Sequence, residues 1–357
     1  MRFKEILSHT FRHINTIIFI WGFVFDIFIL PDIKGIEAKL IGLLYIVMVA
    51  LFIYFREWII SRNTASSMEG KLFTLCSFVI SFFSGSALSF VFVYSMRSAE
   101  ITSSWPILFM LLLTMVINEF VSTHNFRFAL DIGILFTATL FYIIFHMPEI
   151  LHKQNDNVFL ISIFITAIIS LFYGQILRKL SHTANAEAPK TFALAIGIPM
   201  IVTMFYFLNA IPAVPLSIDK IGIYHNLIKE GNNYKMAEET QSGWLSKIKT
   251  EDFHFTTNDK AIYFYSSIDT PAEITAPISH VWEYYDNEKE KWIEKTTISF
   301  NIVSVRGGGY KTYSEKENIT EGLWRVTVKV GSNRVIGRKK FNIIKSNDEL
   351  KLNEVNF

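Results

Sequence analysis

Seven long apolar stretches fill residues 14 to 211 of this 357-residue chain, and they limit its fold more than any other feature. An α-helix needs about 20 apolar residues to cross the roughly 30 Å hydrocarbon core of a bilayer. Backbone N–H and C=O groups must be paired within such a segment, so the runs are predicted to be helical. A soluble bundle is the alternative, and seven runs in succession, each with at most one charge, argue against it. The predicted spans are Ile14–Leu30, Leu40–Phe55, Leu72–Ser95, Trp105–Val121, Phe128–Met147, Val158–Leu177 and Thr191–Ile211.

The loops between these spans predict an orientation. With the N-terminus in the cytoplasm, the inner segments carry ten Lys and Arg residues and the outer segments carry four. Basic residues concentrate on the cytoplasmic side of membrane proteins. An odd number of spans then places the C-terminal tail on the opposite side of the membrane. The first span is too long for the apolar part of a signal peptide, so we expect it to remain as an anchor.

Charge and cysteine content narrow the function classes. The formal net charge is +2, and Lys and Arg are scattered through the loops and the tail without forming a basic patch. This distribution excludes a nucleic-acid-binding protein. The single cysteine, Cys76, lies in the third predicted span. The tail therefore cannot contain a disulfide bond, and its stability must come from packing.

Residues 212–250 are predicted to form an amphipathic linker at the outer interface. Pro212 and Pro215 end the last span, and Ser217 is a suitable N-cap for a short helix. Such a helix would lie in the membrane interface or, equally well, pack on the soluble domain. Its apolar stripe would consist of Ile218, Ile221, Tyr224, Leu227 and Ile228.

Residues 251–357 alternate with a period of two, which predicts half-buried strands of an antiparallel sheet. Trp324, Val326, Val328 and Val330 share one face, and the run from Ile298 to Ile302 repeats the pattern. Six or seven short strands separated by turns indicate a β-sandwich, for which we expect an Ig-like architecture. Further strands are predicted at Ala261–Ser267, Ile278–Tyr285, Tyr310–Lys316 and Val335–Ile344. The predicted fold is thus a seven-helix transmembrane bundle over residues 1–211 with a C-terminal β-sandwich.

Several short motifs occur along the chain: Asn118–Phe120, Tyr206–Ser217, Gly222–His225, Pro277–Trp282, Arg306–Tyr310, Gly322–Val328, Ile336–Arg338 and Phe341. They resemble those of bacterial multi-pass membrane proteins that carry the domain of unknown function numbered 2914. The resemblance covers nearly the whole chain and implies an inner-membrane protein with an outward C-terminal β-domain. No established activity comes with it, so no catalytic residue is carried over.

Three carboxylates fall inside the apolar runs: Asp26, Glu119 and Asp131. An intramembrane carboxylate is expensive and marks a proton relay or substrate path by default. All three lie near the ends of their spans, however, where a side chain reaches interfacial water. Arg127 also lies four residues before Asp131 and is a possible partner, so a structural role is the favoured interpretation.

The tail combines aromatic with polar side chains near its turns, as surfaces that bind sugars or peptides do. Trp282 and Trp324 are assigned to the core instead. Among the six candidate binding residues, His280 is the weakest, because a histidine on an apolar strand face is more often structural than a ligand. The candidate binding residues are His280, Trp292, Arg306, Tyr310, Lys311 and Tyr313. The sequence contains no catalytic, cofactor or metal-binding motif such as HExxH, paired CxxC or GxSxG.

Three functions remain, and the first is favoured. In the first, the chain is a membrane-anchored protein of the bacterial inner membrane. Its outward, periplasmic or extracellular β-domain binds an envelope polysaccharide, a peptide or a partner protein. Alternatively, it is a transporter or sensor that works through the intramembrane carboxylates, or a membrane enzyme with a site near His225 at the outer interface. The tail offers binding chemistry but no catalytic constellation, which decides the order.

Overall fold

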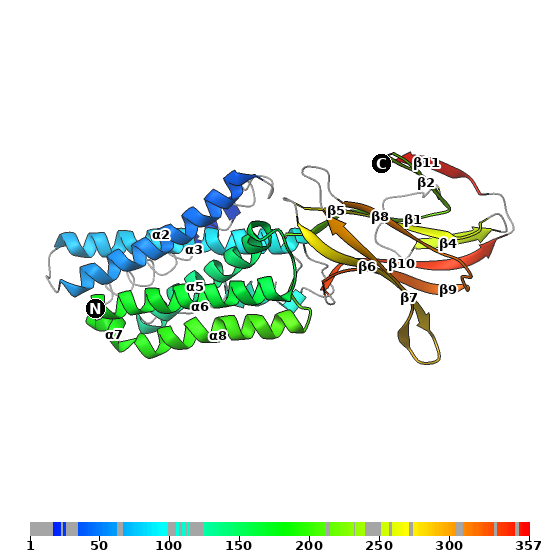
Figure 1. Cartoon of the computed structure of the whole chain (residues 1–357). Helices are drawn as coiled ribbons and strands as arrows, with labels where there is room; N and C mark the ends of the chain where they lie inside the picture. Colours follow the sequence, from blue (N-terminus) through cyan, green and yellow to red (C-terminus); the bar gives the residue numbers. More distant parts are fainter. Residues whose placement is uncertain are drawn as a thin grey trace, which may run out of the picture. The chain divides into compact units, whose positions relative to one another are not determined.

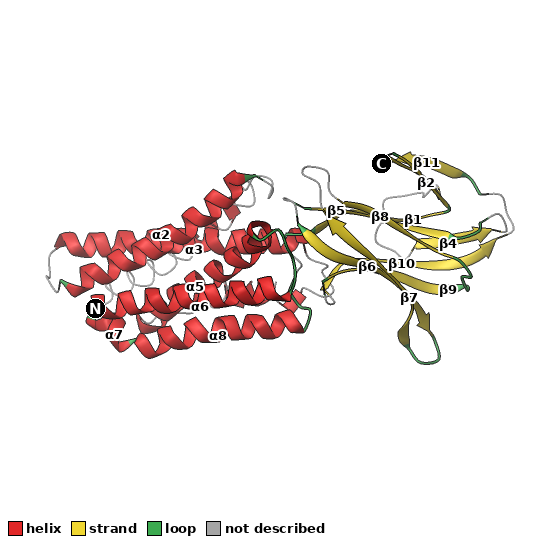
Figure 2. Cartoon of the chain, viewed as in Figure 1, coloured by secondary structure: helices red, strands yellow, loops and turns green. Residues whose placement is uncertain are grey.

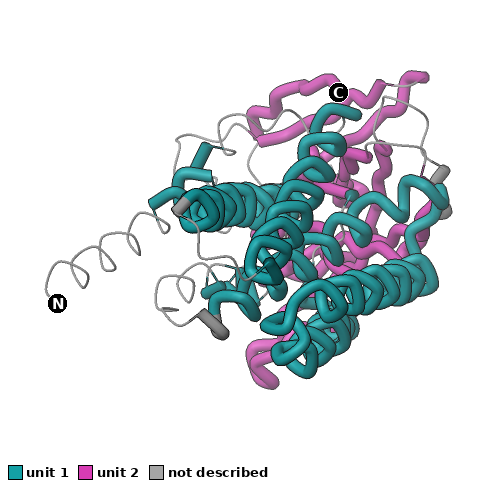
Figure 3. The backbone as a smooth tube through the Cα atoms, turned by 90° about the vertical axis from the view of Figure 1, so that its left-hand side faces the viewer, with its two compact units in different colours: residues 1–97, 101–215 teal, residues 98–100, 216–357 magenta. Residues whose placement is uncertain are grey.

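The chain forms two compact units, a helical one that ends at Pro215 and a β-rich one that begins at Leu216 (Figures 1 and 3). Residues 98–100 are grouped with the second unit. Figure 2 shows helices in the first and strands in the second. The computed structural model describes residues 17–22, 24–25, 35–62, 67–98, 105–106, 109–111, 113–114, 124–211, 215–231, 233–239, 251–256, 259–270, 274–303, 310–331, 334–346 and 350–357.

Five helices among these residues are long and apolar enough to cross a membrane. They confirm the helices that were predicted as the second, third, fifth, sixth and seventh spans. The first and fourth predicted spans lie largely outside the described residues, so the count of seven is not supported. The long helices are α2 Ile36–Ser61, α3 Ser67–Ser98, α5 His124–Ile150, α6 Asp156–Leu180 and α8 Ala188–Phe207, and the short α7 covers His182–Ala186.

Helix α6 has the inside-out character of a helix that faces lipid. Its buried stripe includes Ser162, Thr166, Ser170 and Gly174, spaced four residues apart. Its exposed face carries large apolar side chains such as Phe164, which is 67% exposed. A surface helix of a water-soluble protein would instead bury its large apolar side chains and expose its polar ones. Within a bilayer, small residues on the buried stripe let helices approach closely. Burial thus supports membrane embedding independently of span length.

Eleven strands among the described residues form three sheets. The five-stranded sheet has the order β4-β10-β9-β6-β7, a central sheet has the order β1-β5-β8, and a small sheet has the order β11-β3-β2. The strands are β1 Ser217–Tyr224, β2 Asn226–Glu230, β3 Asn233–Glu239, β4 Glu251–Thr256, β5 Ile262–Asp269, β6 Thr275–Asp286, β7 Lys291–Val303, β8 Tyr310–Lys316, β9 Gly322–Val330, β10 Arg334–Ser346 and β11 Leu352–Asn356.

These strands confirm the predicted pattern of the tail. The strands expected at residues 261–267, 278–285, 298–302, 310–316, 324–330 and 335–344 are all present, as β5 to β10. The pairing is antiparallel, as predicted, except between β4 and β10, which run parallel; no strand was predicted at β4. The domain is sandwich-like, and an Ig-like topology stays a prediction.

The helix predicted after Ser217 was wrong, because this segment forms strands β1 and β2. A β-bulge between Ile218 and Lys220 explains the misleading pattern. The inserted residue puts Ile218 and Ile221 on the same strand face at a spacing of three, which imitates a helix. The segment 212–250 is therefore not a linker throughout, since β1 to β3 belong to the β-rich unit.

The central sheet is covered on both faces along its middle strand, β5. On one side, Ser314 of β8 and Ser266 of β5 bond to His280 of β6 in the five-stranded sheet. On the other, the ring of Tyr265 packs against Tyr234 of the small sheet at a centroid distance of 5.4 Å. Three stacked layers result, with the sandwich core between the central and five-stranded sheets.

We expect the fragment Leu216–Phe357 to fold without the helices. It has its own core, in which Trp282, Phe264 and Phe341 are fully buried, and it is within the size range of independent domains. Far-ultraviolet circular dichroism of the purified fragment should show β-structure with a cooperative thermal transition. A disordered spectrum would mean that the β-rich unit depends on the helical one.

Candidate functional site

In the part of the chain that the structure describes, the three layers leave one strand position empty at the edge of the central sheet. Ile218 of β1 lies against Gly337 of β10, and Ser314 of β8 lies against His280 of β6. Beyond β6 the five-stranded sheet continues with β7, whereas the central sheet ends at β8. The inner face of β7 therefore has no opposing strand among the described residues.

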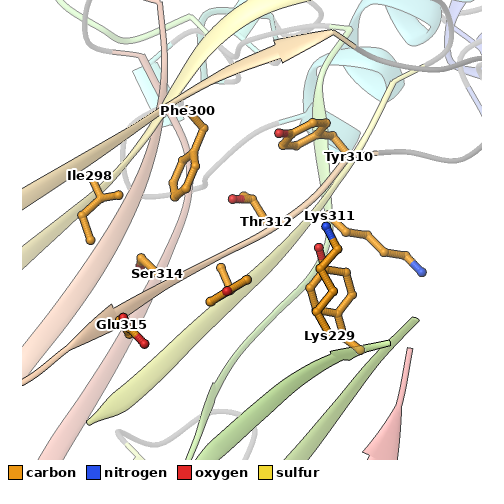
Figure 4. Close-up of a pocket in the computed structure, with 10 residues that line it drawn as sticks. Lys229, Ile298, Phe300, Tyr310, Lys311, Thr312, Ser314 and Glu315 are labelled. Atoms are coloured by element: carbon orange, nitrogen blue, oxygen red, sulfur yellow. The ribbon is translucent and has the colours of Figure 1, made fainter. Parts of the chain in front are cut away.

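A pocket with a volume of about 460 Å³ occupies this position. In Figure 4, Ile298 and Phe300 lie on one side of β8, and Lys229 and Lys311 lie on the other. The pocket thus wraps around the free edge of β8. Its lining consists of Lys229, Tyr234, Ile298, Phe300, Tyr310, Lys311, Thr312, Tyr313, Ser314 and Glu315.

Alternation along β8 gives the pocket two chemically different sides. Thr312 and Ser314 are buried and point toward the five-stranded sheet, while Tyr313 and Glu315 are exposed on the opposite face. Tyr234 of the small sheet meets Tyr313 edge to face at 6.1 Å between ring centroids. The apolar side faces β7 and the charged aromatic side faces the small sheet.

One end of the opening is closed by a side-chain bridge. Lys316, the last residue of β8, donates a hydrogen bond from Nζ to Thr296 Oγ1 of β7 at 2.7 Å. The accessible edge of β8 therefore runs from Tyr310 to Glu315, a length of about 20 Å at roughly 3.3 Å per residue.

The structure brings together three of the six predicted binding residues, Tyr310, Lys311 and Tyr313, in this pocket. Trp292 lies elsewhere, at the far end of β7. There it packs beside Tyr285, and the centroid of its ring lies 4.3 Å from the guanidinium carbon of Arg325. The predicted aromatic residues thus form two separate surfaces.

His280 is removed from the candidate surface because its side chain is fully buried. Its Nε2 bonds to Ser266 Oγ and its Nδ1 to Ser314 Oγ, both at 2.9 Å. Burial lowers the pKa of His280 to about 3, so the ring is neutral at physiological pH. Trp282 donates from Nε1 to the same Ser314 Oγ. Trp282 and Trp324 are core residues as predicted.

The remaining pocket residues were not found from the sequence. Thr312, Ser314 and Glu315 continue the alternation of β8, so the strand prediction contained a signal for them. Lys229 and Tyr234 lie in the segment that was predicted to be a linker, where no strand was expected. Arg306, Asp26 and Glu119 lie outside the described residues.

Asp131 belongs to a buried ion-pair network at one end of the helical unit. It accepts a hydrogen bond from Arg56 Nη1 at 2.6 Å and lies 3.6 Å from Arg127 Nε. Glu57, next to Arg56, accepts hydrogen bonds from the hydroxyls of Ser181 and Thr183. The two cations balance the two carboxylates, which supports the structural interpretation of Asp131 over a proton relay.

The same helices are joined a second time by Lys39 of α2 and Glu149 of α5. At 1.5 Å per residue, Lys39 and Arg56 are separated by about 26 Å along α2. This spacing is close to the thickness of a hydrocarbon core. The two ion pairs thus lie near the two ends of an apolar section of membrane dimensions.

A second charged cluster surrounds His225 at the junction of β1 and β2. The ring donates from Nδ1 to Asp259 Oδ1 at 3.0 Å and from Nε2 to Glu239 Oε1 at 3.1 Å. Glu239 also accepts from His254 Nδ1 and its backbone N–H. With His225 5% exposed and both nitrogens bonded, the cluster fastens strands together rather than presenting a catalytic base. Among the described residues, no group of His, Cys, Asp or Glu is arranged to hold a metal ion.

This cluster predicts a pH-dependent contribution to stability. Burial opposes the charge of His225, but its hydrogen bonds to Glu239 and Asp259 outweigh burial and raise its pKa. Stability from a raised histidine pKa is complete below the unfolded value, about 6.5, and is lost as pH rises through the folded value. Burial also opposes the charge of Glu239, but hydrogen bonds from His225 and His254 lower its pKa to about 2.

The stabilising effect of His225 should therefore be larger at pH 6 than at pH 9. Urea unfolding of the wild-type fragment and of a His225→Gln variant measures it as the difference between their free energies of unfolding at each pH. His280 is present in both proteins, so its own pH-dependent contribution to stability cancels when the two are compared at the same pH. A difference that grows between pH 6 and pH 9 would contradict the assignment of His225 as a cation.

Comparison with known proteins relates only part of the chain to a family. Residues 275–343, from β6 into β10, match the family described as "Protein of unknown function (DUF2914)". The motifs quoted outside this segment remain a resemblance. No curated protein matches the chain.

A comparison with solved structures adds nothing on the fold. The alkylpurine DNA glycosylase AlkC of Pseudomonas fluorescens, bound to DNA containing an abasic site analog, is 9% identical. The match covers 88% of this chain and 99% of that one, with a TM-score of 0.19. A score this low carries no argument about fold or function.

Proposed function

We propose that this chain is a membrane-anchored binding protein of the bacterial cell envelope. Its helices anchor the β-domain at the outer side of the cytoplasmic membrane, and the domain binds an extended polymer, peptide or polysaccharide, or a segment of a partner protein. The observation that carries the proposal is the pocket at β8, which combines aromatic rings, two lysines and a free strand edge. Aromatic faces with a few placed polar groups suit such ligands.

The alternatives have weaker support. A transporter or sensor working through Asp131 would need a carboxylate free to change partners, and this one is paired with Arg56. An interfacial enzyme at His225 would need an accessible base, and this ring is buried with both nitrogens bonded. Binding at the pocket asks for no such rearrangement.

The outward orientation of the β-domain has its own test. It rests on the excess of basic residues in the predicted cytoplasmic loops. Alkaline phosphatase fused after Phe357 should be active in cells, because the enzyme requires an oxidising compartment for its disulfides. An inactive fusion, with a fluorescent cytosolic reporter at the same position, would reverse the orientation.

Binding is tested on the full chain in detergent. Its retention is measured on purified peptidoglycan sacculi, on immobilised envelope polysaccharide and on arrays of immobilised nine-residue peptides. Tyr313→Ala and Tyr310→Ala should weaken binding to the retained polymer by about tenfold or more, as expected for aromatic anchors. Trp292→Ala is the matched control and should change it less than about twofold, since its surface is separate.

Two results would contradict the proposal. Binding lost in Trp292→Ala but kept in Tyr313→Ala would move the site to the outer face of the five-stranded sheet. Retention on none of the three materials would remove the binding function itself.

A further inference from the structure

We infer that the ligand of this pocket is a single peptide strand of another protein, which adds to the free edge of β8 and completes the central sheet. The inference rests on the proposed binding function and specifies its ligand. Edge strands carry unpaired backbone N–H and C=O groups and are templates for an added strand. Among the described residues, β8 is paired only with β5.

The apolar floor of the pocket fits such a strand. A strand beside β8 would lie over Ile298 and Phe300 of β7, which line the pocket and are partly exposed. Alternate side chains of the added strand would point at these two residues and cover them. A polysaccharide would leave the backbone groups of β8 without strand partners, so the geometry favours a peptide.

The charges along β8 predict the pattern of that peptide. On the outer face, Lys311, Tyr313 and Glu315 follow one another at a spacing of two. Cross-strand neighbours of opposite charge stabilise a pair of strands, and like charges destabilise it. The added strand should therefore carry an acidic residue beside Lys311 and an apolar or aromatic residue beside Tyr313. A basic residue should lie beside Glu315, four positions from the acidic one. Lys229 also lines the pocket and adds positive charge.

A second copy of this chain fits the edge less well than a lone strand. Pairing of β8 with β8 of another copy would extend the central sheet, but each copy also carries the five-stranded sheet beneath it. That sheet reaches one strand beyond β8, through β7. The two five-stranded sheets would then compete for the same space. A single strand fills the vacant position without this conflict.

The test uses the full chain in detergent and a library of random nine-residue peptides. Peptides enriched on the wild-type chain and lost on Tyr313→Ala are resynthesised with blocked termini, and their affinities are measured by calorimetry. Each peptide is then N-methylated at alternate residues, once on each of its two edges. Methylation of the bonded edge removes several hydrogen bonds and should weaken binding by about tenfold or more. Methylation of the other edge should change it less than about twofold.

A charge exchange tests the predicted register. Lys311→Glu should weaken a peptide with an acidic residue beside this position, and exchanging that residue for Lys should restore binding. A random-coil-to-strand change of the bound peptide, seen by isotope-edited infrared spectroscopy, should accompany binding.

The outcomes separate this inference from the proposed function. Equal effects of both methylation patterns, or binding of polysaccharide alone with loss in Tyr313→Ala, would overturn strand addition and keep a binding role for the pocket. Self-association that competes with the peptides and is lost in Tyr313→Ala would replace the partner strand by a second copy. An absence of enriched peptides would overturn the inference, and failure on polysaccharide and sacculi as well would overturn both.

Discussion

Replacement of Arg56 by Met should lower the free energy of unfolding of the helical unit by about 3–5 kcal/mol. Arg56 is 3% exposed, and its partner Asp131 is 2% exposed. Its loss leaves Asp131 and the neighbouring Glu57 with Arg127, which lies 3.6 Å from Asp131. Methionine keeps much of the length of the side chain, so the effect comes from the buried carboxylates that lose their partner rather than from a cavity.

Heat denaturation of the full chain in detergent, followed by circular dichroism at a helical wavelength, measures this effect. The midpoint should fall by roughly 10 °C, given that 1 kcal/mol corresponds to a few degrees in chains of this size. A second change, Asp131→Asn, should recover part of the lost stability, because it neutralises one of the two buried carboxylates that have lost Arg56 as their partner. The double variant thus separates charge from packing.

Lys39→Met is the matched control, because Lys39 joins the same two helices through Glu149. The side chains of Lys39 and Glu149 are 26% and 16% exposed, so Glu149 is less deeply buried than Asp131 when its partner is removed. The expected loss is under about 1 kcal/mol. Equal losses for Arg56→Met and Lys39→Met would show that burial does not govern the strength of these pairs.

Five of the seven predicted spans are found as long apolar helices. They could be predicted because the length of such a run is set by the bilayer, independently of how the helices pack. It also suggested Arg127 as a partner of Asp131, because the two are four residues apart on one helix. It did not suggest Arg56, which approaches from another helix, 75 positions away in the chain. Tertiary ion pairs leave no periodic signal.

In the β-domain, β8 was predicted over its full length, because its alternation continues without interruption. The prediction failed at β1, where a single inserted residue changed the spacing of the isoleucines. The pocket itself was out of reach, because it depends on how far one sheet extends past another. Tyr310, Lys311 and Tyr313 could be named from composition near a turn, but the apolar floor from β7 could not.

The core of the β-domain should respond strongly to Trp282→Ala, with a loss of about 3–5 kcal/mol. Trp282 is fully buried between the sheets, where its ring lies 6.3 Å from that of Phe264 and 6.3 Å from that of Phe341. Alanine would leave a cavity among these rings. It would also remove the Nε1 donor to Ser314 Oγ, the hydroxyl that bonds to His280. Urea unfolding of the Leu216–Phe357 fragment measures the change as a lower midpoint.

Trp292→Ala in the same fragment is the control, since it removes the same side chain from a partly exposed position. Trp292 packs over Arg325, whose guanidinium stays bonded to Glu283 through two hydrogen bonds of 2.6 Å when the ring is removed. The expected loss is that of one exposed cation–π contact, about 0.5–1 kcal/mol. If Trp292→Ala destabilised the fragment as much as Trp282→Ala, Trp292 would be a packing residue, and it could no longer serve as the neutral reference for binding at β8. The pocket variants would then need a different control, such as Tyr285→Ala, before a loss of retention could be assigned to Tyr310 and Tyr313.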